Sequence, residues 1–436
     1  MNSTRTRLKK IFAFAAPLLY RIRPLYSLYH TSMARRAAVR FGFPGKKLIV
    51  IGVTGTNGKT TTCNLIHSIL AKAGLKAGLI STVNTVVGGK ERVNETKLTS
   101  LPPEVTQKLL SQMVEAGDRY AVLEVSSIAL DQNRFFGVPF TVSVFTNFTH
   151  DHLDYHKTMG RYLEAKGKLF QGKPKISVIN LDDEKASFFL HFPADKKIAY
   201  ALKQGNPDVT ASLTDKEQNT FLFDFREQKI EIALKLPGFF NLYNALAAAS
   251  ATYGLGIPLP AIKQGIESLK LVPGRMQGVR AGQPFRVVVD YAHTPDGFDK
   301  ALSALKEKTG GRLIAVFGAT GERDKNKRPV LGQVASRYSD LIVLTEEDPG
   351  KEDALSIIQE VMAGIDQNKF ALEKNLWIIP HRKEALQKAF SLAREGDTVA
   401  LLGLGAQTVM VTKEGKVPYH EPTVAKEILE SLGHRA

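Results

Sequence analysis

A glycine-rich segment between an apolar run and a helix-like segment restricts the fold of this chain more than any other feature. Residues 47–53 form a β-branched, apolar run, and the segment Gly52-Val-Thr-Gly-Thr-Asn-Gly-Lys-Thr-Thr61 begins at its end. Residues 60–73 then carry apolar side chains at helical spacing. A strand, a glycine turn and a helix N-terminus in this order present backbone N–H groups that bind phosphate. The sequence therefore predicts a phosphate-binding loop.

The loop departs from the standard spacing, because Val53 occupies the place of the first glycine. Lys59 is still positioned to neutralise phosphate charge, and Thr60 to ligate Mg²⁺. We therefore expect a bound nucleotide whose terminal phosphates carry magnesium. The residues assigned to the nucleotide here are Gly55, Thr56, Asn57, Gly58, Lys59, Thr60 and Thr61.

Short apolar runs alternate with helix-like stretches along the rest of the chain, which is typical of parallel sheets with crossover helices. Residues 205–236 instead alternate polar and apolar residues and predict small antiparallel strands. The Pro273-Gly274 pair is a hinge signal. The predicted fold class is α/β, with a mostly parallel central sheet and a second, Rossmann-like sheet. The expected parts are a basic amphipathic arm (1–46), a central P-loop ATPase domain (47–273) and a C-terminal Rossmann-like domain (274–436).

The formal net charge of +16 is concentrated at the N-terminus, because residues 1–47 contain eleven Lys and Arg and no acidic residue. The rest of the chain is nearly balanced and contains no recognised nucleic-acid-binding module, so we expect no nucleic-acid partner. The single cysteine, Cys63, excludes an intrachain disulfide and favours the reducing cytoplasm. No run approaches the roughly 20 apolar residues that span a bilayer.

The arm has an amphipathic pattern with two interpretations. It could lie on the inner, anionic face of the membrane, or its apolar face could pack on the central domain. Its apolar side chains recur at spacings of three or four at Leu8, Ile11, Phe12, Ala15, Leu18, Leu19, Ile22, Leu25 and Tyr29.

A series of motifs in fixed order resembles the Mur ligase family, and within it the members that add the third amino acid of the peptidoglycan stem peptide. The resemblance starts at Thr54-Gly-Thr-Asn-Gly-Lys-Thr60 and covers residues 47–436. The later motifs are Glu124-Val-Ser-Ser127, Asp151-His-Leu-Asp-Tyr-His156, Ala165-Lys166, Gly274-Arg-Met276, Asp290-Tyr-Ala-His-Thr-Pro295 and Gly321-Glu-Arg-Asp-Lys-Asn-Lys-Arg-Pro329.

The resemblance implies an ATP-dependent, ADP-forming ligase. It would activate a muramyl-peptide carboxylate as an acyl phosphate and couple it to an amino acid. Such chemistry brings two anions together, so cations must screen them. Lys59, Glu124, His152 and Lys166 correspond to the catalytic groups, and the resemblance implies that CO₂ carbamylates Lys166. The implied magnesium ligands are Thr60, Glu124, His152 and the carbamylated Lys166.

Further residues are carried over from the family by position. Asn241 and Asn244 correspond to an adenine-contacting pair, and Arg275 and Asp290 to groups that meet phosphate and ribose when the domains close. The residues that correspond to muramyl-peptide contacts are Thr99, Ser100, Ser126, Gln132 and Arg134.

Two departures bear on substrate choice. The family's diaminopimelate-adding members carry Asp-Asn-Pro-Arg and Gly-Lys-Gly-His-Glu, and this chain has Glu347-Asp-Pro-Gly350 and Gly403-Leu-Gly-Ala-Gln407. Arg323 alone persists from that acceptor set, so the acceptor need not be strictly diaminopimelate; the acidic residues around Glu347 and Asp348 suit a basic amino acid such as lysine. About 46 residues also cannot form the uridine-nucleotide-holding domain with which these ligases normally begin, so the donor could be UDP-linked or lipid-linked.

Two alternatives stay open at this stage. One is another Mur-like amide ligase acting on a lipid-linked or non-muramyl donor. The other is a non-catalytic nucleotide-binding adaptor that recruits cell-wall enzymes. Retention of Lys59, Glu124, His152 and Lys166 argues against the adaptor.

Overall fold

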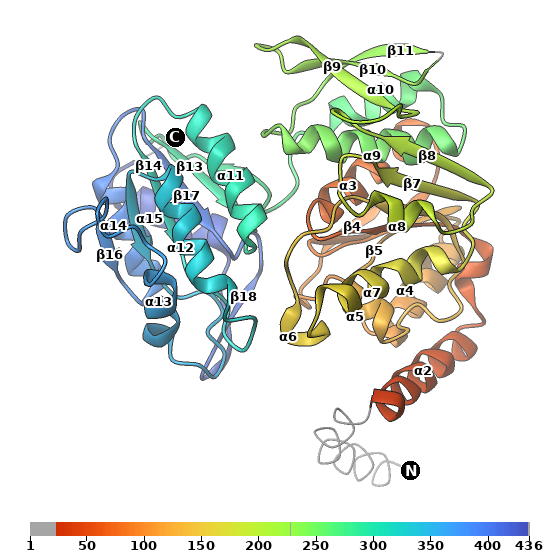
Figure 1. The fold of residues 1–436 in the computed structure, drawn as a ribbon, viewed down its shortest axis with the longest axis horizontal. Helices are drawn as coiled ribbons and strands as arrows, with labels where there is room; N and C mark the ends of the chain where they lie inside the picture. Colours follow the sequence, from red (N-terminus) through yellow and green to blue (C-terminus); the bar gives the residue numbers. More distant parts are fainter. Residues whose placement is uncertain (1–22, 227, 435–436) are drawn as a thin grey trace.

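The structure, a computed structural model, describes residues 23–226 and 228–434. Two α/β units lie side by side, joined near Pro273, and helix α2 (Arg23–Arg40) packs against the first unit (Figure 1). The predicted amphipathic pattern at positions 8–22 lies outside the described residues. Among the described helices, none is both long and apolar enough to cross a membrane.

Eight strands of the described chain form the first sheet, in the order β4-β3-β2-β5-β1-β6-β7-β8. Strands β2, β5, β1, β6, β7 and β8 run parallel, and β3 and β4 add an antiparallel edge. The strands are β1 (Ile49–Thr54), β2 (Ala77–Ile80), β3 (Asn84–Val87), β4 (Lys90–Val93), β5 (Tyr120–Glu124), β6 (Phe140–Phe145), β7 (Ile176–Asn180) and β8 (Lys196–Tyr200).

Helices cover both faces of this sheet, so its central strands are buried along almost their whole length. One face packs on α3 (Lys59–Lys72), α9 (Phe240–Gly254) and α10 (Leu259–Ser268). A small antiparallel sheet of β9 (Thr210–Asp215), β10 (Thr220–Asp224) and β11 (Lys229–Ala233) extends this core, as the alternation in residues 205–236 predicts. The other face packs on α4 (Pro103–Glu115), α5 (Ser127–Asp131), α7 (Met159–Gln171) and α8 (Ala186–Leu190).

The second unit is a six-stranded sheet within residues 277–402, in the order β12-β13-β17-β14-β15-β16. Its strands are parallel except for β12 at the edge, and helices again cover both faces. The strands are β12 (Gln277–Val279), β13 (Arg286–Asp290), β14 (Leu313–Phe317), β15 (Leu341–Leu344), β16 (Leu376–Ile378) and β17 (Thr398–Leu402). The helices are α11 (Pro295–Glu307), α12 (Lys327–Tyr338), α13 (Ala354–Met362), α14 (Arg382–Leu392) and α15 (Glu421–Ser431).

Three short elements complete the fold: α6 (Leu153–His156), the 3₁₀ turn η1 (Pro44–Lys47) and a hairpin of β18 (Val409–Thr412) and β19 (Gly415–Pro418). The predicted α/β fold, with a largely parallel first sheet and a second Rossmann-like sheet, is confirmed. Parallel strands carry ligand sites beyond their carboxyl ends, and the ends of β1, β5 and β13 all lie where the two units meet.

Candidate active site between the two units

The phosphate-binding loop connects β1 to α3, and its two glycines have little room for a side chain. A Cβ on Gly55 would lie 1.8 Å from Thr146 Oγ1, and one on Gly58 would lie 2.2 Å from Asn244 Oδ1. Gly58 also has a φ of 85°, in the left-handed region that favours glycine. The Lys59 ammonium donates hydrogen bonds to the carbonyls of Gly55 and Thr56, at 3.0 and 2.8 Å. The Lys59 side chain therefore folds back onto the backbone of the loop.

Glu124 ends the neighbouring strand β5 and lies against the start of α3. The Thr60 hydroxyl contacts both carboxylate oxygens at 3.0 and 3.1 Å, and the backbone N–H of Thr82 donates to Oε2 at 2.7 Å. Arg275 of the second unit donates to the same Thr60 oxygen at 3.0 Å, and its guanidinium lies 4.4 Å from the centre of the Tyr291 ring. The structure thus brings Thr60, Glu124 and Arg275 together.

Lys166 lies on α7 with 1% of its surface exposed. Its ammonium nitrogen is 2.6 Å from the Gly55 carbonyl oxygen and 4.4 Å from the centre of the Tyr162 ring. Burial, and then the charge of Lys59, lower the pKa of Lys166 well below its ordinary value. The buried Lys166 amine, which lies directly behind the phosphate loop, therefore loses its proton more readily than an ordinary lysine does.

His152 precedes α6 in a left-handed conformation, with φ 55°, and its Nε2 is 3.4 Å from an Asp151 carboxylate oxygen. Burial lowers the pKa of His152 despite Asp151, and the charges of Lys166 and Lys59 act in the same direction. His152 is therefore a neutral imidazole near both lysines. In the described part of the chain, no three His, Cys, Asp or Glu side chains converge as a ready-made metal site.

A second region of the interface is a cavity of about 430 Å³ beside the loop, lined by residues of both units. Asn244 lines it, and the Asn244 amide donates to Asn241 Oδ1 at 2.8 Å. Asp290 instead accepts hydrogen bonds from the backbone N–H groups of Met276 and Ala292, within its own unit. The other polar side chains that line the cavity include Asn57, Asn147, Asn180, Asp182, Asp183, Tyr243 and Lys300.

The predicted donor contacts form one network next to Glu124. The Ser100 hydroxyl donates to the Glu124 carbonyl and accepts from the N–H of Ser126, both at 2.9 Å. Arg134 donates to the Ser100 carbonyl at 2.7 Å and to Gln132 Oε1 at 2.8 Å. Thr99, which directly precedes Ser100, is half-buried.

Helix α2 contributes to this network, which the motifs do not predict. The Gln132 amide donates to the Tyr26 hydroxyl at 2.6 Å, and the Asn133 amide donates to the Thr31 hydroxyl at 2.8 Å. The sequence signal that could have found Tyr26 is its place in the amphipathic arm. The part of the arm that forms α2 thus contacts the first unit, and packing of the predicted apolar face stays a prediction.

The predicted acceptor residues are divided between two places. Glu347 is 3% exposed, and its Oε2 would lie 2.0 Å from a Cβ on Gly403, so Gly403 makes room for that carboxyl group. The Gln407 amide donates to the Tyr291 hydroxyl at 3.0 Å. Arg323, in contrast, is exposed and lies 3.5 Å from Asp154 of the first unit.

Asp348 makes a contact that the motifs do not predict. Lys97, from the segment between β4 and α4, donates to both of its carboxylate oxygens at 2.7 and 2.8 Å. The Asn57 amide also donates to Asp296 at 2.7 Å, and His150 Nε2 lies 2.8 Å from Asp324. Polar contacts between the two units therefore surround the site.

Two family models match the chain: the Mur ligase middle domain over residues 53–252 and the Mur ligase, glutamate ligase domain over residues 274–405. A relative from Caldanaerobacter subterraneus subsp. tengcongensis is 38% identical over 91% of this chain and 81% of its own length. It is named UDP-N-acetylmuramoyl-L-alanyl-D-glutamate--2,6-diaminopimelate ligase. A Roseiflexus relative, named UDP-N-acetylmuramyl-tripeptide synthetase, is 37% identical over 92% of this chain and 82% of its own length.

A solved structure of a UDP-N-acetylmuramoyl-L-alanyl-D-glutamate--2,6-diaminopimelate ligase is 32% identical to the chain, with a TM-score of 0.60. The match covers 89% of this chain and 79% of the solved one. The chain therefore belongs to the Mur ligase family, whose peptidoglycan-building members are ATP-dependent, ADP-forming amide ligases.

Proposed function

We propose that this chain adds an amino acid to a muramyl-peptide precursor, through an acyl phosphate on the donor carboxylate. The observation that carries the proposal is the contact of Arg275 with Thr60, which also contacts Glu124. That contact puts a cation of the second unit beside the phosphate loop, where the transferred phosphoryl group develops negative charge. The relatives' printed names support the donor class.

The donor set fits magnesium. Mg²⁺ in phosphoryl-transfer sites is held by one or two protein oxygens together with phosphate oxygens and water, so no protein cage is needed. Thr60 and Glu124 would supply hard oxygen ligands, and His152 would supply a neutral nitrogen. When bound with ATP, the metal screens the charge between the donor carboxylate and the γ-phosphate.

The chain's own residues account for orientation and charge. Lys59 leaves its loop carbonyls for the phosphates, and Arg275 neutralises the transferred group from the opposite unit. In the proposal, Asn241 and Asn244 hold the adenine ring and Asp290 the ribose side. Ser126, Gln132 and Arg134 hold the donor, with Thr99 and Ser100 behind them. The lowered pKa of Lys166 suits carbamylation, because only a neutral amine attacks CO₂.

For the acceptor, we propose a basic amino acid such as lysine rather than strictly diaminopimelate. Gly350 and Gln407 replace an arginine and a glutamate of the family's diaminopimelate motifs, and Glu347 and Asp348 supply carboxylates instead. Losing charged contacts to a buried head group costs about a hundredfold in preference. Competition between diaminopimelate, lysine and ornithine tests this, and a product pool that is almost wholly diaminopimelate-linked would contradict it.

The central experiment incubates the chain with ATP, Mg²⁺, UDP-muramyl-dipeptide and a mixture of candidate amino acids, and weighs the products. We expect a tripeptide product and equimolar ADP. ADP release that needs a lipid-linked or non-muramyl donor would instead favour another amide ligase of this family. Binding of ATP without any donor-dependent ADP release would favour a nucleotide-binding adaptor.

We also propose that residues 1–22 make peripheral contact with an anionic membrane.

A further inference from the structure

A short loop of the first unit is built to present one lysine to the second unit. Asn94 organises residues 94–98: its amide donates to the Ser81 and Leu98 carbonyls at 2.8 and 3.1 Å. Its oxygen accepts from the Thr96 N–H and hydroxyl at 3.1 and 2.7 Å. Lys97 lies at the tip of this loop with a φ of 61°, a conformation that is uncommon for residues other than glycine. The loop thus holds Lys97 in a costly conformation.

The partner of Lys97 has an equally uncommon backbone. Asp348 follows β15 with a φ of 45° and accepts the N–H of Val411 at 2.7 Å in addition to the two bonds from Lys97. The Lys97 side chain is 12% exposed and that of Asp348 is 15% exposed. Among the described residues, Lys97 is the one cation that forms an ion pair with Asp348, and Lys97 belongs to the opposite unit. Opening of the two units therefore leaves this carboxylate without its positive charge.

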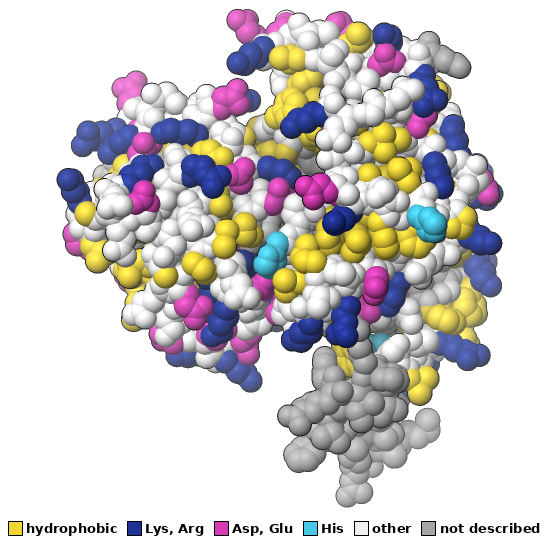
Figure 2. All heavy atoms as spheres, viewed as in Figure 1, with side chains coloured by type: hydrophobic (Ala, Val, Ile, Leu, Met, Phe, Trp, Pro, Cys, Tyr) yellow, Lys and Arg dark blue, Asp and Glu magenta, His cyan; other side chains and the backbone are white. Residues whose placement is uncertain are grey.

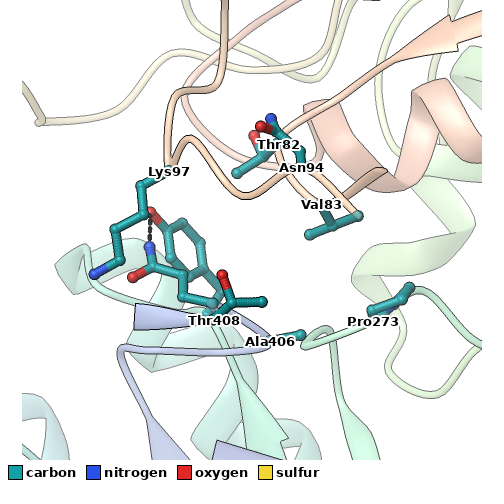
Figure 3. A pocket seen from close by; sticks show the side chains of 9 residues that line it. Thr82, Val83, Asn94, Lys97, Pro273, Ala406 and Thr408 are labelled. Carbon is teal, nitrogen blue, oxygen red and sulfur yellow. Dashed lines mark hydrogen bonds between the residues drawn. The ribbon is translucent and has the colours of Figure 1, made fainter. Parts of the chain in front are cut away.

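Lys97 also borders a small pocket between the units that contains one unsatisfied oxygen. Figure 3 shows Thr82, Val83 and Asn94 on one side of the pocket and Ala406 and Thr408 on the other, with Lys97 beside them. Gln407 also lines it, and its Oε1 is buried without a hydrogen-bond partner in the described structure. Oε2 of Glu347, the neighbour of Asp348, is also buried without a partner among the described residues, but Glu347 does not line this pocket. Buried acceptor atoms of this kind call for a donor.

The pocket is also continuous with the reacting end of the site. Thr82 lines it, and the N–H of Thr82 is bonded to the Glu124 carboxylate. Tyr291 lines it as well, and the ring of Tyr291 packs under Arg275. Thr82 and Tyr291 therefore place this small pocket between the Glu124 and Arg275 end of the site and the Lys97–Asp348 pair.

We propose that Lys97 is an internal ammonium that occupies the acceptor's side-chain site on Asp348, and that an acceptor with a side-chain ammonium binds by replacing it. The inference rests on the proposed function and deepens it, because it assigns the acceptor class by the charge that the site already holds. Lys97 is then a selectivity residue. Lys97 competes with every basic acceptor for Asp348. An acceptor with an uncharged side chain does not displace Lys97 from Asp348.

Substitution of Lys97 tests the proposal with a matched pair of acceptors, lysine and norleucine, which differ in the terminal amine. Lys97→Met removes the competitor, so the KM for lysine should fall about tenfold while the KM for norleucine stays within about twofold. Asp348→Asn removes the carboxylate that both ammonium groups bind, so it should reduce the preference for lysine over norleucine about tenfold. The KM values for ATP and donor should not change in Lys97→Met.

Lys416→Met is the control for a general loss of positive charge, because Lys416 is exposed and acts on Lys97 only through its charge. It should leave both acceptor KM values unchanged. A KM for lysine that rises in Lys97→Met, or a change that is equal for both acceptors, overturns the proposal. Calorimetric titration with free lysine separates this test from the proposed function. If the unaltered chain forms no amide product, the proposed function fails, but equal lysine affinities of the unaltered chain and Lys97→Met still overturn the role of Lys97.

Discussion

Lys166 has unusual surroundings for a buried lysine. A buried lysine normally finds a carboxylate, yet this one contacts a carbonyl oxygen and an aromatic ring. Burial and then the charge of Lys59 lower the pKa of Lys166, because both disfavour the charged amine. Because only the neutral form of an amine attacks CO₂, a lowered pKa favours the proposed carbamate, whose negative charge would lie near the ammonium of Lys59.

Lys166→Ala should reduce ligation at least about a hundredfold, because the variant has no amine to carbamylate. Added short carboxylates should restore part of the rate by filling the same space. Product formation per minute, with and without acetate, measures both effects. Lys168→Ala is the control, since Lys168 lies on the same helix in a partly exposed ion pair with Asp131 and should change the rate little. Full activity of Lys166→Ala without rescue would contradict the carbamate.

Glu347 should make the stability of the fold depend on pH. Burial raises the pKa of Glu347 to about 7 from an ordinary 4.5. Between these values the folded chain keeps a proton that the unfolded chain has lost. Stability from this group therefore falls as pH rises from 4.5 to 7, by up to about 3 kcal/mol. Glu347→Gln should flatten the dependence in urea unfolding at pH 5 and pH 7, and an unchanged slope would exclude Glu347 as its source.

Site residues that belong to a contiguous sequence motif can be predicted, and site residues outside such motifs cannot. Thr60 and Glu124 were assigned by position in motifs, and the structure brings them into contact. Lys97 and Tyr26 belong to no motif, and their partners lie 251 and 106 positions away. No motif identifies either contact, because both depend on how separate elements pack.

Helix α2 attaches to the first unit through small side chains. Ala37 and Ala38 are buried against the unit, and a Cβ on Gly137 would lie 3.3 Å from that of Ala38. Close approach of this kind leaves no space for a longer side chain. The hydrogen bonds from Gln132 and Asn133 then fix the helix beside the predicted donor contacts.

Ala38→Leu should loosen α2 and destabilise the protein by about 1–3 kcal/mol, because the new side chain overfills a packed contact. Val39→Leu, one position away and 59% exposed, should have little effect. The free energy of unfolding in urea compares the two variants, and limited proteolysis reports on α2 directly. Equal stability of both variants would mean that α2 contributes no packing energy.

The strands that the sequence predicts best are the buried ones. The apolar runs at 313–317, 341–344 and 398–402 coincide with β14, β15 and β17, because strands buried on both faces must be apolar throughout. The edge strand β4 is exposed along its whole length, and β19 is largely exposed. They carry no apolar signal, so their pairing comes from the turns and neighbours around them.

Charge is distributed unevenly along the chain: residues 1–47 carry an excess of basic residues, and the rest carries both signs. Figure 2 shows basic and acidic side chains interspersed over the surface of the two units. Removing residues 1–22 leaves the packed helix α2 and should reduce sedimentation with anionic liposomes at low salt, at about 1 kcal/mol per basic residue near the headgroups. Equal sedimentation of the full and shortened chains would exclude membrane contact through that segment.

The polar bridges between the two units also make the enzyme sensitive to ionic strength. The ion pairs Lys97 with Asp348 and Arg323 with Asp154 are both partly open to solvent. Dissolved ions weaken such pairs over a screening length of about 8 Å at physiological salt. Each addition of salt therefore shifts the population from the joined toward the separated arrangement. Because the reacting groups come from both units, the turnover rate should fall with salt even when every substrate is saturating.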